Sequence, residues 1–361
     1  MNGQDFRINA RVNNLKPSDI EKIYTLIAQI DAVKNSWYLT KKLSPQIIQR
    51  LTQSVIITST GASNRIEGNR LTDEEVETLY KNLRIKKLKT RDDQEIISYL
   101  QMLTLIFENY KNIPINESHI LQIHQGMLFY SEKDAGHKGR YKIGSNRVEA
   151  KDNKGNIIGV IFDPTPPYLV KKEMQELIDW YVWSIKNEVK HPLIVIANFI
   201  FEFLAIHPFQ DGNGRCSRLL TNLMLLQQGY HFTTIASNEK IIENHKVDYY
   251  LALNKSQNSW KTENENITPW IQFFLNVVKL QATQAIALLE GNDIEHLLSP
   301  KQLLVWQWIL QNESREFSRK DAVEALGFPE RTIESIIKKL VSMKKLKRLG
   351  EGPASRYKLL K

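Results

Sequence analysis

The sequence has little cysteine and no long uninterrupted hydrophobic run, and each scarcity excludes a class of protein. Cys216 is the single cysteine among 361 residues, which excludes an intrachain disulfide and a multi-cysteine zinc site. The best apolar run, residues 192–206, is interrupted by Asn198 and Glu202 and is too short to span a bilayer. No N-terminal segment is typical of a signal peptide, so we expect a cytoplasmic protein without a membrane partner.

The remaining composition is that of an ordinary globular protein, with enough length for two or three domains. The net charge of +9 is unevenly distributed along the chain. Residues 296–361 hold fourteen Lys and Arg against seven Asp and Glu, which gives +7 and leaves +2 for the other residues. The basic character therefore belongs to a C-terminal module.

The stretch with the most chemically capable side chains is residues 207–218, HPFQDGNGRCSR. The run before it is apolar on nearly all sides, as in a buried helix. Residues 219–228 after it have a helical period that ends at Gly229, a favourable residue after a helix. We therefore expect a polar loop between two core helices.

Four residues of this stretch predict an anion site. Gly212 and Gly214 fall where the second helix should begin, so free backbone N–H groups and the helix dipole would face a bound anion. Arg215 and Arg218 lie on the first turn of that helix and add bidentate donors for phosphate.

Two further residues complete the set. His207 can accept a proton near neutral pH, and Asp211 can hold a hard cation through oxygen. An anion cradle, a base and a metal ligand together indicate phosphoryl or nucleotidyl transfer. The simpler alternative is a polar turn whose histidine is satisfied by backbone groups and whose arginines are solvated. We expect Cys216, which lies on the same helix turn as the two arginines, to pack in the core.

The same stretch resembles the signature of the Fic family, H-P-F-x-[DN]-G-N-G-R-x-x-R, and meets every fixed position. The resemblance covers roughly residues 40–290. It implies an adenylyltransferase that moves AMP from ATP to Ser, Thr or Tyr hydroxyls of proteins, with Mg²⁺. It also implies residue roles: His207 as base, Asp211 on Mg²⁺, Asn213 with the N–H groups of Gly212 and Gly214 at the α-phosphate, Arg215 at the leaving pyrophosphate, Arg218 at the γ-phosphate, and Phe209 as an anchor in the core.

A second segment resembles a family motif. Residues 63–68, SNRIEG, match the inhibitory pattern [ST]-x-x-x-E-[GN] at the end of a predicted helix spanning about 45–68. The resemblance implies that Glu67 pairs with Arg218 in place of the ATP γ-phosphate and that Ser63 supports the helix end. A capped helix end with a solvated Glu67 is the alternative.

The remaining N-terminal residues, 1–110, are expected to be helical, with a capping box at 72–75. Residues 111–290 would form the Fic core, and Gly291-Asn292-Asp293 would mark its end. His119 and His124 are five positions apart, which suits a metal pair poorly, so we interpret both as structural.

Within the core, the hydrophobic period changes to two. Residues 139–150 and 156–162 predict two short strands around a turn. This hairpin, about 139–162, resembles the Fic flap, which implies a target protein bound by strand pairing and self-modification on the flap. An exposed hairpin without a catalytic role is the alternative. The family also implies a homodimer.

The helical segment 244–257 resembles the part of the family that lines the adenine pocket. Tyr249 and Tyr250 are suited to stack on a purine, and Asn254 could bind its edge. An aromatic pair on a helix also fits core packing.

Residues 296–361 resemble a winged helix-turn-helix, with helices near 299–312, 319–326 and 330–343 and wing strands at 346–350 and 355–359. We expect DNA or protein contact through this basic module. The residues predicted to face outward are Arg331, Thr332, Glu334, Ser335, Lys338 and Arg356.

The predicted fold is therefore mainly α, a Fic-type helical bundle with a β-hairpin flap and a small C-terminal winged helix-turn-helix domain. Two alternative functions stay open. The same site could remove AMP from proteins, alone or in addition to transfer, or the chain could be a DNA-binding regulator whose core senses nucleotide. Transfer of phosphate or phosphocholine is disfavoured because those Fic-like variants alter loop residues that are unaltered here.

Overall fold

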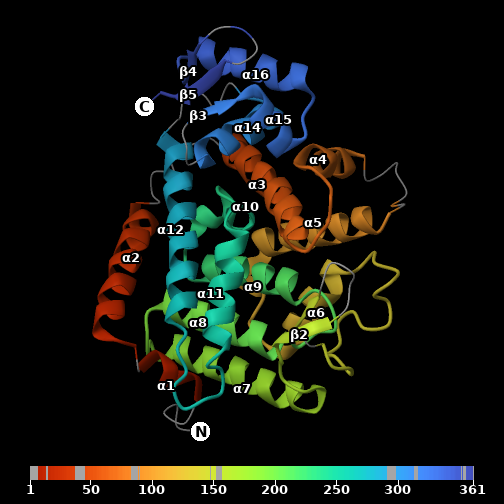
Figure 1. Ribbon diagram of the computed structural model, residues 1–361, viewed down its shortest axis with the longest axis vertical. Coiled ribbons are helices and arrows are strands. Elements are labelled where there is room, and N and C mark those ends of the chain that lie inside the picture. Colours follow the sequence, from red (N-terminus) through yellow and green to blue (C-terminus); the bar gives the residue numbers. More distant parts are fainter. Residues whose placement is uncertain are drawn as a thin grey trace.

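The computed structural model describes residues 7–13, 15–36, 45–82, 88, 90–146, 148–151, 157–290, 298–312, 316–350, 352 and 355–360 (Figure 1). The helices are α1 (Arg7–Asn13), α2 (Pro17–Asn35), α3 (Pro45–Ile66), α4 (Asp73–Lys81), α5 (Arg91–Asn109), α6 (Glu117–Met127), α7 (Pro167–Lys186), α8 (Pro192–Ile206), α9 (Asn213–Gln227), α10 (Asn238–Asn244), α11 (Lys246–Gln257), α12 (Thr268–Glu290), α14 (Pro300–Gln311), α15 (Arg319–Leu326) and α16 (Glu330–Ser342). The strands are β1 (Val148–Lys151), β2 (Ile157–Phe162), β3 (Glu316–Ser318), β4 (Leu346–Leu349) and β5 (Arg356–Leu359).

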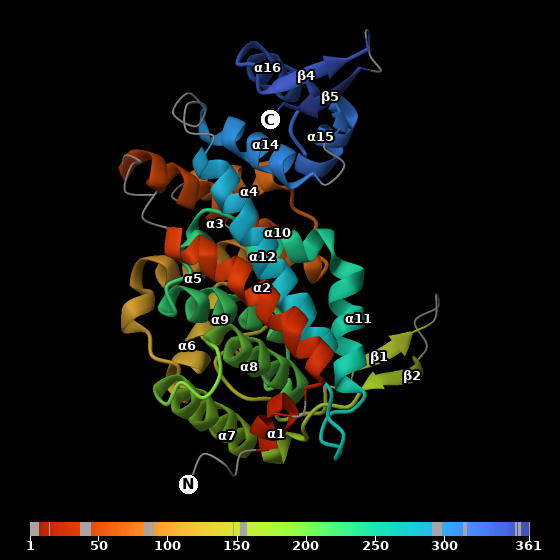
Figure 2. The same ribbon diagram turned by 90° about the vertical axis from the view of Figure 1, so that its left-hand side faces the viewer.

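Helix α8 lies inside the helical bundle because its sequence is apolar on all sides. Pro192 begins the helix, and all of its residues from Leu193 onward are buried. Helices α7, α9 and α12 pack against it, and α2 lies along the outer side of α12 (Figures 1 and 2). The predicted pair of core helices is therefore present, and the loop between them follows directly after a buried helix.

The two residues that interrupt the apolar run bind the N-terminal helix. Arg11 of α1 is buried, and its Nε donates to Asn198 Oδ1 at 2.7 Å. The same guanidinium pairs with Glu202, whose burial is thereby compensated by an opposite charge. Each polar group on α8 is thus satisfied within the core.

Helix α3 crosses the bundle and packs on α5 and α10. Its C-terminal end is followed by α4, which begins with the predicted capping box: Glu75 N donates to Thr72 Oγ1 at 3.3 Å and Thr72 N donates to Glu75 Oε2 at 2.8 Å.

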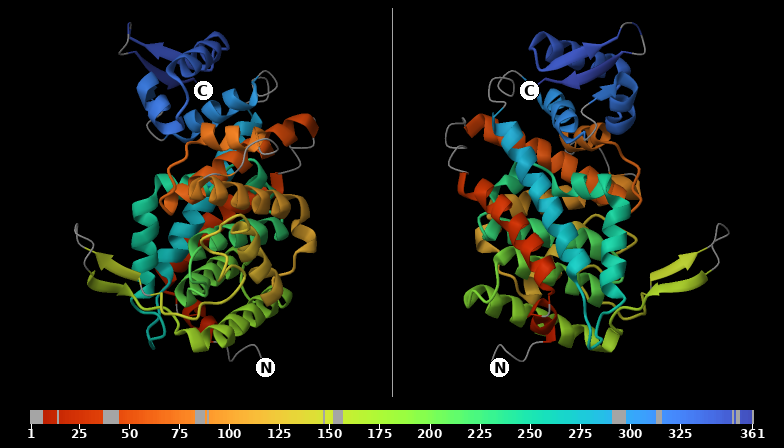
Figure 3. Two further views of the ribbon diagram at one scale, coloured as in Figure 1. Left: turned by 90° about the vertical axis from the view of Figure 1, so that its right-hand side faces the viewer. Right: turned by 60° about the vertical axis from the view of Figure 1, so that its left-hand side comes forward.

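Strands β1 and β2 form an antiparallel hairpin that projects from the bundle (Figures 2 and 3). The first strand is shorter than predicted, because residues 139–146 have no strand structure. Those residues instead run across the 207–212 loop and donate hydrogen bonds to it, for example from Lys142 N to Pro208 O at 2.9 Å. The predicted turn residues 152–155 lie outside the described residues.

The C-terminal elements α14 to β5 gather at the end of the molecule opposite the N-terminus (Figure 1). Their sheet has the order β3–β5–β4, and both partners of β5 are antiparallel. The three helices and the last two strands lie close to their predicted ranges, whereas β3 was not predicted. Helix α14 packs on α3, where Ser54 Oγ donates to Gln307 Oε1 at 2.8 Å.

The predicted core end at residues 291–293 and parts of the wing turn, residues 351, 353 and 354, lie outside the described residues. Within the described residues, no helix has the length and apolar character needed to cross a membrane.

Candidate functional site

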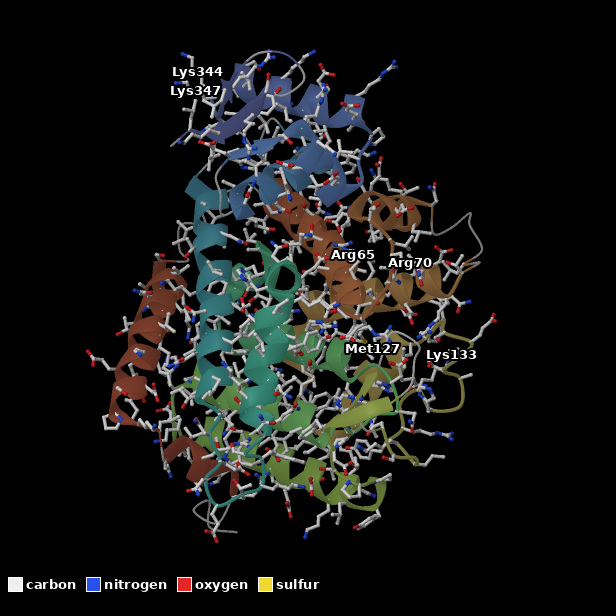
Figure 4. The ribbon with its side chains drawn as sticks, in the orientation of Figure 1. Arg65, Arg70, Met127, Lys133, Lys344 and Lys347 are labelled. Atoms are coloured by element: carbon white, nitrogen blue, oxygen red, sulfur yellow. The ribbon has the colours of Figure 1, made fainter. Side chains whose placement is uncertain are left out.

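The loop between α8 and α9 holds a tight backbone shape. Helix α8 ends at His207, which has a left-handed conformation with φ 52° and ψ 60°. Gly212 precedes α9 with φ 83°, and a Cβ there would overlap Met127 of α6 (Met127 is labelled in Figure 4). The left-handed φ at position 212 favours glycine, because other residues rarely adopt it.

The side chain of Asn213 closes the loop. Its Oδ1 accepts from Phe209 N at 2.9 Å, and its Nδ2 donates to Phe209 O at 2.7 Å. Asn213 is buried and both ends of its amide bind Phe209, so its side chain shapes the loop. Its contact with an α-phosphate stays a prediction. Phe209 is fully buried, as its predicted anchoring role requires.

His124 of α6 supports the loop from below. Its ring stacks on Phe209 with centroids 3.7 Å apart, its Nε2 lies 2.9 Å from Asp211 O, and its Nδ1 accepts from Gly139 N at 2.9 Å. The acceptor role of Nδ1 places the ring proton on Nε2. Burial lowers the pKa of His124 to about 4, which keeps the ring neutral. The sequence spacing of His119 and His124 did not indicate that His124 contacts the loop.

His207 is oriented as a base. Its Nδ1 lies 3.2 Å from Leu204 O and donates to it, so Nε2 carries the free lone pair. Burial is the main reason that the pKa of His207 is lowered to about 4, and the charge of Lys142 acts in the same direction. The imidazole is therefore neutral at physiological pH and can accept a proton.

Asp211 can serve as one of several ligands of a bound cation. Its Oδ1 accepts from Gly212 N at 2.6 Å, and Nη2 atoms of Arg91 and Arg215 each lie 3.5 Å from its carboxylate. Burial would raise the pKa of Asp211, but Arg215, the Gly212 N–H and Arg91 lower it, so the group is ionised. Its side chain is 41% exposed and thus reachable.

The described residues contain no group of three His, Cys, Asp or Glu side chains that could hold a metal by themselves. A single reachable carboxylate fits Mg²⁺, which keeps waters and is commonly bound by one or two carboxylates together with substrate phosphates. Asp211 therefore fits a magnesium ion that arrives with a nucleotide.

The distant helix end reaches the site through Arg218. Arg218 is buried, its Nη2 lies 2.8 Å from Glu67 Oε1, and its Nε donates to Ser63 Oγ at 2.8 Å. The second contact with the helix is from Nη2 to Ser63 O at 2.9 Å. Burial would lower the pKa of Arg218, but Glu67 together with Tyr249 and Tyr99 raises it. The predicted residues Ser63 and Glu67 are therefore brought to Arg218.

The carboxylate of Glu67 also covers the start of α9. A Cβ built on Gly214 would overlap Glu67 Oε1 and would lie 3.2 Å from Nη1 of Arg218. That Nη1 is buried and makes no hydrogen bond to another described residue. A carboxylate thus occupies the position that an anion would take at this helix N-terminus.

Arg215 points to the other side of the loop. Its side chain is 3% exposed, with Nη1 3.4 Å from Glu95 and Nη2 3.5 Å from Asp211. Its Nε is buried without a hydrogen bond among the described residues. The two arginines therefore flank the start of α9, one beside Asp211 and one beside Glu67.

The predicted adenine-pocket residues of α11 separate into two groups. Tyr249 is buried, and its ring packs edge-on against Trp270 at 5.7 Å, which is a core environment. Tyr250 is 45% exposed, and burial and the nearby charge of Glu67 raise its pKa. Asn254 is half-buried on the same helix. Tyr250 therefore offers free ring surface next to Glu67, whereas Tyr249 does not.

Arg65 is a residue that the motif left unassigned, and it fixes the end of α3. Its Nε donates to Glu243 Oε1 at 2.6 Å, its Nη2 lies 2.9 Å from Asp73 Oδ1, and its Nη1 donates to Leu71 O at 2.9 Å (Figure 4). Glu243 lies on α10, Asp73 begins α4, and Leu71 lies just before α4. They hold the helix end that carries Glu67 at a defined place.

Comparison with known families matches residues 114–225 to the Fic/DOC family. The protein adenylyltransferase Fic of Nematostella vectensis is 27% identical over 216 residues, which is 58% of this chain and 44% of that protein. A probable protein adenylyltransferase of Aquifex aeolicus is 30% identical over 126 residues, which is 34% of this chain and 38% of that protein. This chain thus matches less than half the length of either relative.

Among solved structures, a Fic family protein from Desulfovibrio desulfuricans has a TM-score of 0.60 and covers 96% of this chain and 97% of its own chain. Its sequence identity is 23%, so the likeness concerns the fold alone. The chain therefore has a mainly helical Fic fold with a small C-terminal three-stranded sheet.

Proposed function

We propose, from the Fic domain of residues 114–225, that the protein is an adenylyltransferase that moves AMP from ATP to hydroxyl groups of proteins. One observation carries the proposal: His207, Asp211 and the buried Arg215 and Arg218 surround the start of α9, where the carboxylate of Glu67 lies in this structure. This arrangement supplies a base, a metal ligand and an anion-binding site within residues 207–218.

His207 would act on the acceptor. Its free Nε2 accepts the proton of a Ser, Thr or Tyr hydroxyl while the hydroxyl oxygen forms a bond to the α-phosphorus of ATP. The bond from that phosphorus to the bridging oxygen breaks, and pyrophosphate leaves. Because the pKa of His207 is about 4, the base is ready without a prior deprotonation step.

The phosphates would be held from both sides of α9. Backbone N–H groups at Gly212 to Gly214 face the α-phosphate, Arg215 the leaving pyrophosphate and Arg218 the γ-phosphate. Asp211 would hold Mg²⁺, which would supply positive charge to neutralise the phosphates. Tyr250 offers the ring surface for the adenine, with Asn254 near its edge and Tyr249 packed behind.

We also propose that the structure represents an inhibited state. Glu67 occupies Arg218 and covers Gly214, so the γ-phosphate of ATP would lose its donor and meet a like charge. Ser63 and Arg65 hold the helix end in place. Release of Glu67 would then be the step that permits productive ATP binding.

The hairpin β1–β2 would be the flap that receives the target protein. It projects from the bundle close to the 207–212 loop, and each strand has one edge without a partner strand among the described residues (Figure 3). Such an edge can add an extended segment by backbone hydrogen bonds. The strands and the turn between them contain no Ser, Thr or Tyr, so self-modification within the predicted flap range 139–162 would have to use Tyr141 or Ser145, which precede β1.

We interpret residues 296–361 as a winged helix-turn-helix domain. Arg331, Ser335 and Lys338 of α16 are exposed, which fits the predicted outer face, and Thr332 and Glu334 are partly covered. Glu334 pairs with Lys338 at 2.9 Å and with Arg319 at 3.5 Å, which lowers the positive charge on this face. Protein contact is therefore favoured over DNA contact by α16. Lys344 and Lys347, beside and within the start of β4, are exposed (Figure 4), and so is Arg356 at the start of β5.

The function is tested by incubating a Glu67→Gly variant with α-labelled ATP and a cell lysate. Label should enter protein, and it should not in the Glu67→Gly/His207→Ala double variant, which should still bind ATP. Feeding adenylylated protein to the same variants distinguishes removal from transfer. AMP release faster than label uptake would overturn the proposed direction.

A further inference from the structure

Four consecutive backbone carbonyls, those of residues 206–209, each accept a hydrogen bond from Lys142 or Asn146, and Phe209 O also accepts one from Asn213 Nδ2. The backbone N of Lys142 donates to Pro208 O at 2.9 Å, and its Nζ donates to Ile206 O at 3.3 Å. Lys142 is 3% exposed, so its ammonium is buried at the C-terminal end of α8. A cation there satisfies carbonyls that lack partners within the helix.

Asn146 binds the next part of the loop. Its Nδ2 donates to His207 O at 3.1 Å and to Phe209 O at 2.7 Å. Its Oδ1 accepts from Lys142 Nζ at 2.6 Å. The two side chains are therefore one hydrogen-bonded unit, and we call residues 142–146 the strap.

The strap holds a backbone shape that needs support. His207 has a φ of 52°, a left-handed conformation that residues other than glycine keep only when their surroundings enforce it. The carbonyl of His207 is one of the two that Asn146 binds, so the strap acts on the residue that carries the base. The ring of His207 makes its own contact on the other side, with Leu204 O.

The strap also connects this loop to both ends of the hairpin. It ends one residue before β1, which begins at Val148. Burial lowers the pKa of Lys142, and the charge of Asp163, the first residue after β2, opposes this effect more than Glu173 does. Because the strap is nearly continuous with β1, movement of the hairpin when a segment binds along its edge would be passed along the backbone to Lys142 and Asn146.

We propose that Lys142 and Asn146 are positioning residues that fix His207 in its left-handed conformation and transmit target binding on the hairpin to the base. The proposal rests on the proposed transfer function. Neither residue touches the reacting atoms. Their effect on the reaction is exerted through the backbone of residues 206–209.

The test uses Lys142→Met and Asn146→Ala in the Glu67→Gly chain, with the exposed neighbours Arg140→Met and Ser145→Ala as matched controls. We expect kcat to fall about 10- to 100-fold, as for misplaced reacting groups, while the Kd for ATP stays the same. The controls should keep the parent kcat. A fall in ATP affinity equal to the fall in kcat would overturn the positioning role.

A second measurement does not depend on activity. In nucleotide-free protein with ¹⁵N-labelled histidine, the ring signal of His207 is identified by its loss in His207→Ala. Both strap variants should shift or broaden this signal, and the controls should not. An unmoved His207 signal in folded strap variants overturns the proposal, whereas absence of any transfer with a shifted signal would overturn only the proposed function.

The double variant tests whether the strap is one unit. Because the two side chains bind each other, the double variant should lose about as much kcat as the stronger single variant. Lys142→Met keeps the backbone bond to Pro208 and should fold even if Asn146→Ala does not. Independent, multiplicative losses would contradict a single strap.

Discussion

The guanidinium of Arg218 and the carboxylate of Glu67 are 151 positions apart in sequence and 2.8 Å apart in space. Arg218 is buried, and its other terminal nitrogen, Nη1, makes no hydrogen bond to another described residue. The carboxylate also covers Gly214 at the start of α9. Two ligands, Glu67 and a nucleotide phosphate, would therefore compete for one arginine.

The pH dependence of transfer should reflect the lowered pKa of His207. A base must be neutral, and a pKa of about 4 keeps His207 neutral down to that pH. In the Glu67→Gly variant we expect protonation of His207 to leave kcat/KM unchanged from neutral pH to about pH 5. It should lower kcat/KM only as the pH approaches 4. The measurement is kcat/KM as a function of pH, with an acceptor peptide that has no group titrating between about pH 4 and 7. An acid limb centred near 6.5 would show an ordinary, solvated histidine.

Asp211→Asn should impair metal use more than nucleotide binding. The substitution removes the negative charge but keeps the shape, and the amide can still accept from Gly212 N. We expect transfer at saturating ATP to fall about 100-fold and to need more Mg²⁺ for half-maximal rate. A magnesium titration of the transfer rate measures both. An unchanged magnesium requirement would exclude Asp211 as the ligand.

Arg65→Met should release the helix end that carries Glu67. It leaves Asp73, which is buried, and Glu243 without their arginine partner, so stability should fall by about 3 kcal/mol in urea unfolding. Because the end of α3 loses its anchors, basal label transfer should rise. Arg70→Met, at an exposed position on the same segment, is the matched control and should change neither quantity (Figure 4). Lower stability without increased transfer would show that Arg65 does not hold Glu67 in its inhibitory position.

The chemistry of the site could be predicted because its groups lie within twelve consecutive residues, 207–218. Helix positions could also be predicted, since N-caps such as Thr72 and a continuous apolar face mark them locally. The contact of Ser63 and Glu67 with Arg218 came from resemblance to a motif. No local pattern alone places those residues together.

The supporting residues could not be predicted, because their roles come from long-range contacts. His124, Lys142 and Asn146 bind the loop from other elements, and nothing in their spacing marks them. Asn213 was assigned to the α-phosphate, yet both ends of its amide bind Phe209. The strand β3 has three residues, too few for a recognisable alternation.

The most direct measurement compares the rate of label transfer from α-labelled ATP in the unmodified chain, in Glu67→Gly and in the exposed control Glu132→Gly. A charged hydrogen bond of the kind between Glu67 and Arg218 is worth about 1.5–3 kcal/mol, so its removal should raise transfer about tenfold or more. Glu132→Gly should leave the rate unchanged. Equal labelling by Glu67→Gly and the unmodified chain would contradict the competition between Glu67 and the γ-phosphate for Arg218.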